Sequence, residues 1–227
     1  MPTLLLFFVV VAVIAGISIY GAMQVDRRRK DLAAWAHDNG LRFTDTNDYG
    51  MANRFPDFTC LRRGEDRYAY NVIRGVWNQR AIHAFDYHYE TYTTHKGRRQ
   101  THHHHFSAVI VTSDVPLKPL LIRPERIFDK IAEFVGFSDI NYESAEFSRR
   151  YHVSAPDKRW AYDVLHARTI EFLLQQPDCQ LEFDHHHILA QRNRRYSLPE
   201  IIAAATVIHG VLDRLPEYLV KQQRGET

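Results

Sequence analysis

The sequence predicts an α+β protein in which an N-terminal single transmembrane helix precedes one cytoplasmic domain with a mainly antiparallel sheet and packed helices. Three observations lead to this prediction. The first 25 of the 227 residues contain no charged side chain. Residues 41–123 are rich in β-forming side chains, in runs that turn residues separate. After Pro124, apolar residues recur at helical spacing.

The apolar N-terminal segment is predicted to span a lipid bilayer. Its helical residues, Leu4 to Met23, would rise by about 1.5 Å each and so match a hydrocarbon core of roughly 30 Å. A cleaved signal peptide is the alternative, but no basic residue precedes the run, and the run exceeds the usual length of about 7–15 residues. We therefore expect a transmembrane anchor at 1–25, a juxtamembrane basic helix at 26–40 and an α+β soluble domain at 41–227.

Four basic residues follow the apolar run, and they predict an orientation. They are Arg27, Arg28, Arg29 and Lys30. Because positive flanks stay on the cytoplasmic side, we expect a single-pass membrane protein with its N-terminus outside and its soluble domain in the cytoplasm. The same cluster is expected to lie at the membrane surface against anionic head groups, at about 1 kcal/mol per residue. The predicted partners are thus the lipid bilayer and a protein at the membrane.

Charge and cysteine content argue against several function classes. The chain has 29 Lys and Arg against 27 Asp and Glu, and its arginine pairs are interleaved with acids, so no nucleic-acid partner is expected. Cys60 and Cys179 lie far apart, which indicates buried thiols in a reducing compartment. The sequence has no phosphate loop, dinucleotide fingerprint or nucleophile elbow. No organic cofactor is therefore expected.

Strands are predicted first along the chain and helices later. Runs of β-branched and aromatic residues indicate strands at 68–73, 81–87 and 102–112, with a turn at 75–79 and a polar connection at 93–101. Helical spacing indicates helices at 31–39, 127–135, 160–165 and 167–175. A strand at 147–154 and a hairpin at 181–183 and 188–190 are also expected. A capping box at 197–200 opens the last helix, which kinks or ends near Pro216.

Fourteen histidines are the chemically suggestive feature of the sequence, and four of them form the run 102–105. If the connection folds about residues 96–97, this run lies opposite residues 86–90. In one register, Asp86, His88 and Glu90 lie beside His102 and His104. In the register shifted by one residue, they lie beside His103 and His105 instead. Such a group would bind zinc or iron. The candidate ligands in the first register are Asp86, His88, Glu90, His102 and His104.

Two functions of different classes follow from these features. The first is a non-enzymatic, membrane-anchored module that binds a partner or ligand at the cytoplasmic face. The alternative is a metal-dependent hydrolase on the hairpin around 86–105, with a divalent metal such as zinc as cofactor. In that case His88 and two histidines of the run would be ligands, and Glu90 or Asp86 the general base. A solvated hairpin end with adventitious metal binding is the plain reading of the same residues.

One stretch after residue 145 has acidic, aromatic and aliphatic residues at regular spacing: Glu146, Phe147, Val153, Asp157, Ala161 and Leu165. These residues match the signature E-F-x-x-x-F-x-V-x-x-x-D-x-x-x-A-x-x-x-L-x-P. The stretch therefore resembles a bacterial membrane-associated family, the domain of unknown function 3137. The chain departs from the signature at Tyr151 and Ala167, and it lacks the more typical double membrane span of the family. The resemblance covers about half of the soluble part. It implies a fold and a bacterial membrane setting, so the expected location is the bacterial inner (plasma) membrane, and it brings no catalytic residues.

Overall fold

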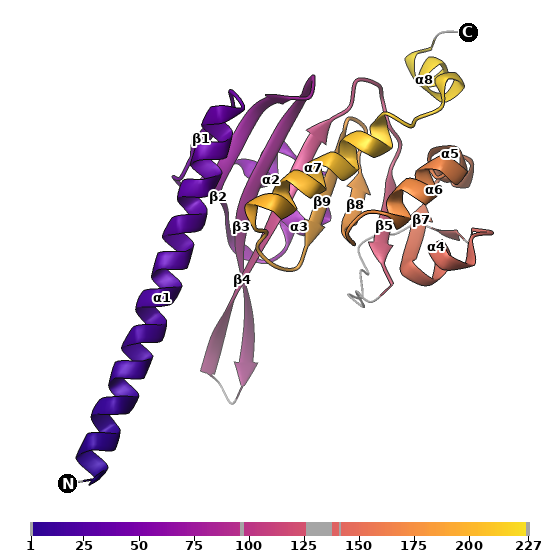
Figure 1. Cartoon of the computed structure of the whole chain (residues 1–227). Coiled ribbons are helices and arrows are strands. Elements are labelled where there is room, and N and C mark those ends of the chain that lie inside the picture. Colours follow the sequence, from indigo (N-terminus) through magenta and orange to yellow (C-terminus); the bar gives the residue numbers. More distant parts are fainter. Residues whose placement is uncertain (1, 96–97, 126–137, 141, 226–227) are drawn as a thin grey trace.

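An antiparallel sheet forms the centre of the fold (Figure 1). The structure is a computed structural model, and it describes residues 2–95, 98–125, 138–140 and 142–225. Within these ranges the sheet has nine strands in the order β1-β2-β3-β4-β9-β8-β5-β7-β6, and each neighbouring pair is antiparallel. The strands are β1 (Arg42–Thr44), β2 (Glu65–Trp77), β3 (Arg80–His95), β4 (Arg98–Thr112), β5 (Leu120–Pro124), β6 (Ser138–Ile140), β7 (Tyr151–Ala155), β8 (Gln180–Phe183) and β9 (His187–Arg192). The expected mixture of helices with an antiparallel sheet is thus present.

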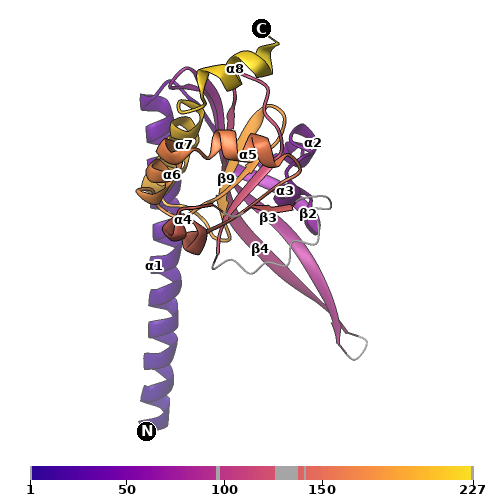
Figure 2. The same ribbon diagram turned by 90° about the vertical axis from the view of Figure 1, so that its right-hand side faces the viewer.

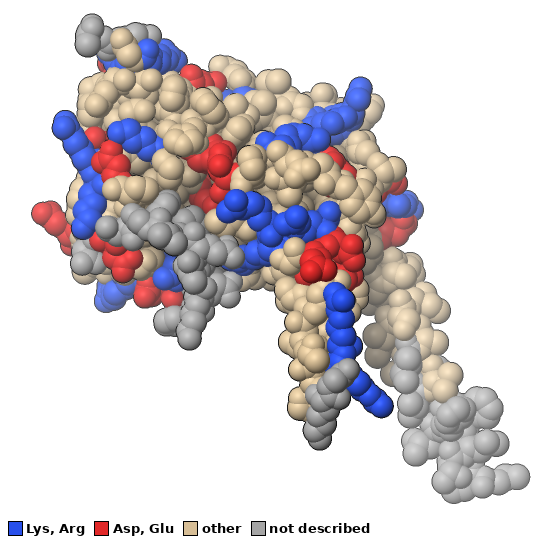
Figure 3. All heavy atoms as spheres, turned by 180° about the vertical axis from the view of Figure 1, so that it is seen from behind, with Lys and Arg blue, Asp and Glu red and all other residues tan. Residues whose placement is uncertain are grey.

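Helices cover both faces of this sheet (Figures 1 and 2). Those described are α1 (Pro2–Asp38), α2 (Met51–Arg54), α3 (Thr59–Arg62), α4 (Ala145–Arg150), α5 (Lys158–Val164), α6 (Ala167–Leu174), α7 (Leu198–Leu212) and α8 (Glu217–Arg224). One buried apolar cluster includes residues of α1, α5, α6 and α7, and a second includes residues of α2 and α3. On the side of the molecule seen in Figure 3, basic and acidic side chains are interspersed.

The alternation of side chains along β3 explains why two separate clusters form. Ile82 and Ala84 belong to the cluster on the side of α1 and α7, whereas Phe85 and Tyr87 belong to the cluster on the side of α2 and α3. Successive side chains of a strand point to opposite faces, so a strand that is apolar on both sides needs helices on both sides. The sheet is therefore sandwiched at its centre.

The apolar N-terminal segment is the first part of one long helix, α1. Its C-terminal part packs on the sheet through Leu32 and Ala36, while its N-terminal part projects beyond the sheet (Figures 1 and 2). Ile17, Tyr20 and Met23 are exposed on the projecting part. Among the residues that the structure describes, no helix combines the length and apolarity needed to cross a membrane.

This finding corrects several expectations together. The transmembrane anchor predicted at 1–25 is wrong, and so is the single-pass placement in the bacterial inner membrane with a cytoplasmic domain that depended on it. The basic segment at 26–40 is also no separate helix. It continues α1 without a break to Asp38, and Gly40 follows with a φ of 67°. The predicted end of the helix at this glycine is confirmed.

The first two hairpins follow the prediction with longer strands. The connection between β2 and β3 consists of Asn78 and Gln79, both with positive φ, instead of the five residues expected. Two residues of this conformation form the turn that matches the twist of paired strands. The tight turn lets the pairing continue to Trp77 and Arg80, which lie directly opposite each other.

The C-terminal half contains one wrong prediction and several confirmed ones. Residues 147–150 are helical rather than extended, because Ser144 caps α4 by accepting a hydrogen bond from the Phe147 amide at 3.3 Å. Strand β7 then begins at Tyr151. The helices near 160 and 170, the hairpin β8–β9 and the capping box of α7 are confirmed. The helix predicted at 127–135 lies outside the described residues.

Burial of His83 on the α2 side predicts a pH-dependent stability. Its ring lies edge-on to Phe55 at 5.2 Å, and burial, followed by repulsion from nearby cations, lowers the pKa of His83 from 6.5 to about 4. The charged or titratable neighbours are Arg54, Arg74, His187 and Asp48. As the pH falls, His83 binds a proton in the unfolded chain before it does so in the folded one. The stability that neutral His83 contributes is therefore fully present above pH 6.5 and is lost as the pH falls through about 4.

We expect the loss of stability over this pH range to be smaller in His83→Phe by about 1–3 kcal/mol. The phenyl ring keeps the contact with Phe55 and cannot bind a proton. Urea unfolding of both proteins at a series of pH values gives the two profiles. Parallel profiles would contradict the assignment to His83.

Candidate functional site

The histidine-rich hairpin is formed by β3 and β4, and its register decides which side chains meet (Figure 1). His88 lies directly opposite His105, and Glu90 lies directly opposite His103. Residues opposite each other on paired strands point to the same face. The structure therefore has the second of the two registers that the sequence allowed, with His103 and His105 beside His88 and Glu90.

Three side chains of this face bring potential ligand atoms together. The Nε2 atom of His88 lies 3.2 Å from Nδ1 of His103, which in turn lies 3.1 Å from Oε1 of Glu90. All three atoms lie within 4.8 Å of one another. Two imidazole nitrogens and one carboxylate oxygen in this arrangement match the donor set of three-ligand zinc sites.

Hydrogen bonds from neighbouring groups fix two of these side chains. Nδ1 of His88 lies 3.1 Å from the carbonyl oxygen of Asp66, and since a carbonyl oxygen only accepts, this nitrogen carries the proton. The Nε2 lone pair of His88 is then directed toward His103. Tyr92 donates its hydroxyl to Oε2 of Glu90 at 2.8 Å, which leaves Oε1 for the cluster.

Burial differs across the cluster and leaves it accessible from one side. His88 is 5% exposed, whereas the side chains of Glu90 and His103 are 15% and 58% exposed. His105 borders the cluster, with its ring 4.9 Å from that of His88 and its Nδ1 3.2 Å from the hydroxyl of Tyr70. The pKa of His105 is lowered mainly by burial and, to a smaller extent, by the nearby His88.

Three of the predicted ligands lie elsewhere. His102 and His104 point to the opposite face, where they contact the hydroxyls of Thr93 and Thr91 at 2.8 Å. The ring of His104 also stacks on Tyr89 at 4.6 Å. Asp86 shares the face of His88 but is occupied by other partners. The predicted set is therefore wrong at these three positions, because the register differs by one residue and Asp86 belongs to a different network.

Asp86 is a buried carboxylate that joins α1 to the sheet. It is 1% exposed and accepts hydrogen bonds from both terminal nitrogens of Arg28, at 2.6 and 2.8 Å. Ser107 and Asn71 donate to it at 2.5 and 2.9 Å. The Nε of Arg28 also donates to the carbonyl oxygen of Tyr196 at 2.6 Å. One carboxylate thus collects donors from α1, β2 and β4.

This network corrects the role predicted for the basic cluster. Arg28 turns onto the sheet instead of lying at a membrane surface. Arg29 pairs with Asp26 and Asp45, and Lys30 pairs with Asp26 at 2.7 Å. Arg27 is exposed. The membrane-surface assignment of Arg27, Arg28, Arg29 and Lys30 depended on the anchor and is withdrawn with it.

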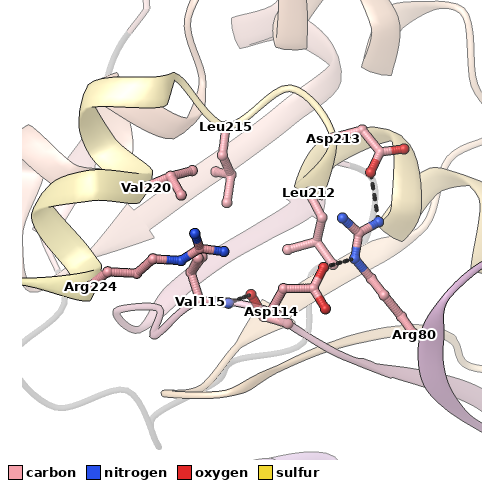
Figure 4. Close-up of a pocket in the computed structure, with 9 residues that line it drawn as sticks. Arg80, Asp114, Val115, Leu212, Asp213, Leu215, Val220 and Arg224 are labelled. Atoms are coloured by element: carbon pink, nitrogen blue, oxygen red, sulfur yellow. Dashed lines mark hydrogen bonds and ion pairs between the residues drawn. The ribbon is translucent and has the colours of Figure 1, made fainter. Parts of the chain in front are cut away.

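A second candidate site lies where α7 meets α8, around Arg80 (Figure 4). Arg80 donates to Asp114 at 2.7 Å and to Asp213 at 2.6 Å, and these contacts join the start of β3 to the end of α7. A cavity of about 340 Å³ opens beside this group. Its other described lining side chains include Val115, Leu212, Leu215, Val220 and Arg224.

The cavity combines polar and apolar surfaces. Arg80 and Arg224 balance the charges of Asp114 and Asp213, so the lining has no net charge. Burial acts to lower the pKa of Arg80, but its hydrogen bonds to Asp213 and Asp114 outweigh burial and raise the pKa above its ordinary value. Sequence reasoning missed this site because Arg80 and Asp213 are 133 residues apart and belong to no motif.

Comparison with known proteins adds a relationship in fold. Neither a protein-family model nor a curated protein sequence matches the chain. Among solved structures, the chain is similar to the crystal structure of the mycobacterial trehalose monomycolate transport factor A, TtfA, with a TM-score of 0.63 and 12% sequence identity. The match covers 82% of this chain and 93% of that chain. At this identity the similarity establishes the fold alone, and the resemblance to the domain of unknown function 3137 stays a prediction.

Proposed function

We propose that this protein is a binding factor that assists the transport of an amphiphilic lipid with a neutral, hydroxyl-rich head group. The observation that carries the proposal is the shared fold with a trehalose monomycolate transport factor over 82% of this chain and 93% of that chain. A binding role also agrees with the absence of catalytic motifs from the sequence. The protein partner expected from the sequence stays a prediction.

The cavity beside Arg80 supports this choice of ligand. Guanidinium donors and carboxylate acceptors together satisfy hydroxyl groups, which both donate and accept. A lining without net charge favours a neutral head group over an anionic one. The apolar wall formed by Leu215 and Val220 suits the first carbons of an acyl chain. The volume of about 340 Å³ falls in the range of small-ligand sites.

Filling the cavity is expected to weaken binding. In Val220→Trp, an indole at the half-buried position would occupy the space of the ligand, and we expect affinity for a short-chain trehalose monoester to fall by about tenfold or more. Calorimetric titration of the full-length protein measures this change. Val76→Trp is the matched control, because Val76 is 66% exposed on β2 outside the cavity lining.

The proposal fails if the wild-type protein binds neither the trehalose monoester nor other neutral glycolipids. Equal affinity of wild type and Val220→Trp would remove the cavity as the binding site. Tight binding of anionic phospholipid with no binding of the neutral ester would contradict the head-group class.

A further inference from the structure

We propose that the hairpin of β3 and β4 binds one zinc ion through Nε2 of His88, Nδ1 of His103 and Oε1 of Glu90. The site is separate from the cavity beside Arg80, so the test of zinc binding does not depend on the test of lipid binding. Among the described residues these are the side chains whose ligand atoms lie close enough together to hold a metal ion.

Two of the three distances between these atoms match those of a zinc coordination shell. Two ligand atoms at about 2.0–2.1 Å from a tetrahedral zinc lie about 3.3 Å apart. The separations are 3.2 Å between His88 and His103 and 3.1 Å between His103 and Glu90. The third separation, between His88 and Glu90, is no more than 4.8 Å, so side-chain rotation of the exposed His103 can bring all three atoms around one ion.

The surrounding hydrogen bonds prepare the ligands for a metal. The Asp66 carbonyl binds the Nδ1 proton of His88 and so leaves Nε2 unprotonated, which is the usual arrangement of a metal-bound histidine. The Tyr92 hydroxyl holds the second oxygen of Glu90. His88 and Glu90 are thus oriented before any ion arrives, and the exposed His103 closes the site from the solvent side.

The donor set selects zinc over harder ions. Two imidazoles and one carboxylate suit zinc, whereas calcium and magnesium prefer oxygen ligands alone. Three protein ligands leave the fourth position to water or another ligand. Because the ligands come from both strands, the ion would tie β3 to β4. Asp86, which the sequence offered as a general base, accepts a hydrogen bond from Arg28 and has no part in this site.

The hairpin also provides its own control. His102 and His104 lie on the same strand as His103 but point to the opposite face, so they can take part in nonspecific binding but not in the site. His103→Ala is the main test because this side chain is 58% exposed and its loss leaves the buried His88 in place. Glu90→Gln tests the carboxylate without a change of size.

The experiment uses full-length, tag-free protein purified without a metal column and dialysed against zinc chloride. We expect one zinc per chain by mass spectrometry of the metal, and a rise in melting temperature that a chelator reverses. Affinity should fall at least about tenfold in His103→Ala and in Glu90→Gln, the effect that loss of even an outer partner produces. The double variant His102→Ala with His104→Ala should bind as the wild type does.

Two outcomes would overturn the proposal. One is less than stoichiometric zinc in the wild-type protein. The other is an equal loss of zinc in His103→Ala and in the double control, which would indicate adventitious binding to exposed imidazoles. Circular dichroism of each variant confirms that the fold is intact, and neither outcome affects the test of lipid binding.

Discussion

Asp86→Ala is expected to lower the free energy of unfolding by about 3–5 kcal/mol, since removal of one partner leaves the others buried without compensation. The guanidinium of Arg28, 22% exposed, would lose both of its hydrogen bonds to the carboxylate. Ser107 and Asn71 would lose their acceptor as well. Urea unfolding of the wild type and the variant measures the difference.

The same variant should loosen α1 from the sheet. Trp35 of α1 contacts Trp77 of β2 edge-on at 6.0 Å, so near-ultraviolet circular dichroism reports their packing. Asp26→Ala is the matched control, because this carboxylate is 45% exposed and binds only surface cations. Its effect should stay below about 1 kcal/mol. A similar loss of unfolding free energy in both variants would show that the buried Asp86 contributes no more to stability than the exposed Asp26.

Gly64→Ala is the second substitution with a large expected effect, a loss of about 2–5 kcal/mol. Gly64 has a φ of 62°, which is unfavourable for alanine. A Cβ atom there would also collide with the carbonyl oxygen of Glu90 and approach the ring of Tyr89 to 2.8 Å. The backbone of β3 would have to move, because the nearest atoms at Glu90 belong to the main chain and cannot rotate away as a side chain can.

Gly40→Ala separates the two causes of this loss. Gly40 has a similar φ of 67°, but nothing lies within 4 Å of its Cβ position. Backbone strain alone should then cost about 1–2 kcal/mol. Chemical unfolding of both variants gives the difference, which should reach at least about 1 kcal/mol if the collision with β3 matters. Equal losses would mean that the Glu90 backbone moves aside freely.

Much of the strand and helix pattern could be predicted because it depends on local sequence. The hairpin of β8 and β9 and the capping box at Ser197 require only neighbouring residues. The strand predicted at 147–154 is confirmed from Tyr151 onward, but its first four residues are helical because Ser144 caps α4. Such competition between a cap and a strand pattern is decided within a few residues.

The sites were harder to predict because their partners are distant in sequence. The sequence allows two registers of β3 and β4, since histidines occupy four successive positions and supply imidazoles in either pairing. The sequence predicts Arg28 at a membrane surface, because nothing near it shows that Asp86, 58 residues later, is buried and needs a cation. The partners of Arg80 were likewise invisible before the fold was known.

The outer part of the β3–β4 hairpin has an unusual mechanical situation. Pairing of β3 with β2 ends at Glu90, and pairing of β4 with β9 ends at Ser107, so beyond these points each described strand has only the other beside it. A two-stranded ribbon is marginally stable in water. Backbone amides near Arg98 should therefore exchange with solvent far sooner than those near Ala84, through openings of the two-stranded part that stop where the third strand joins.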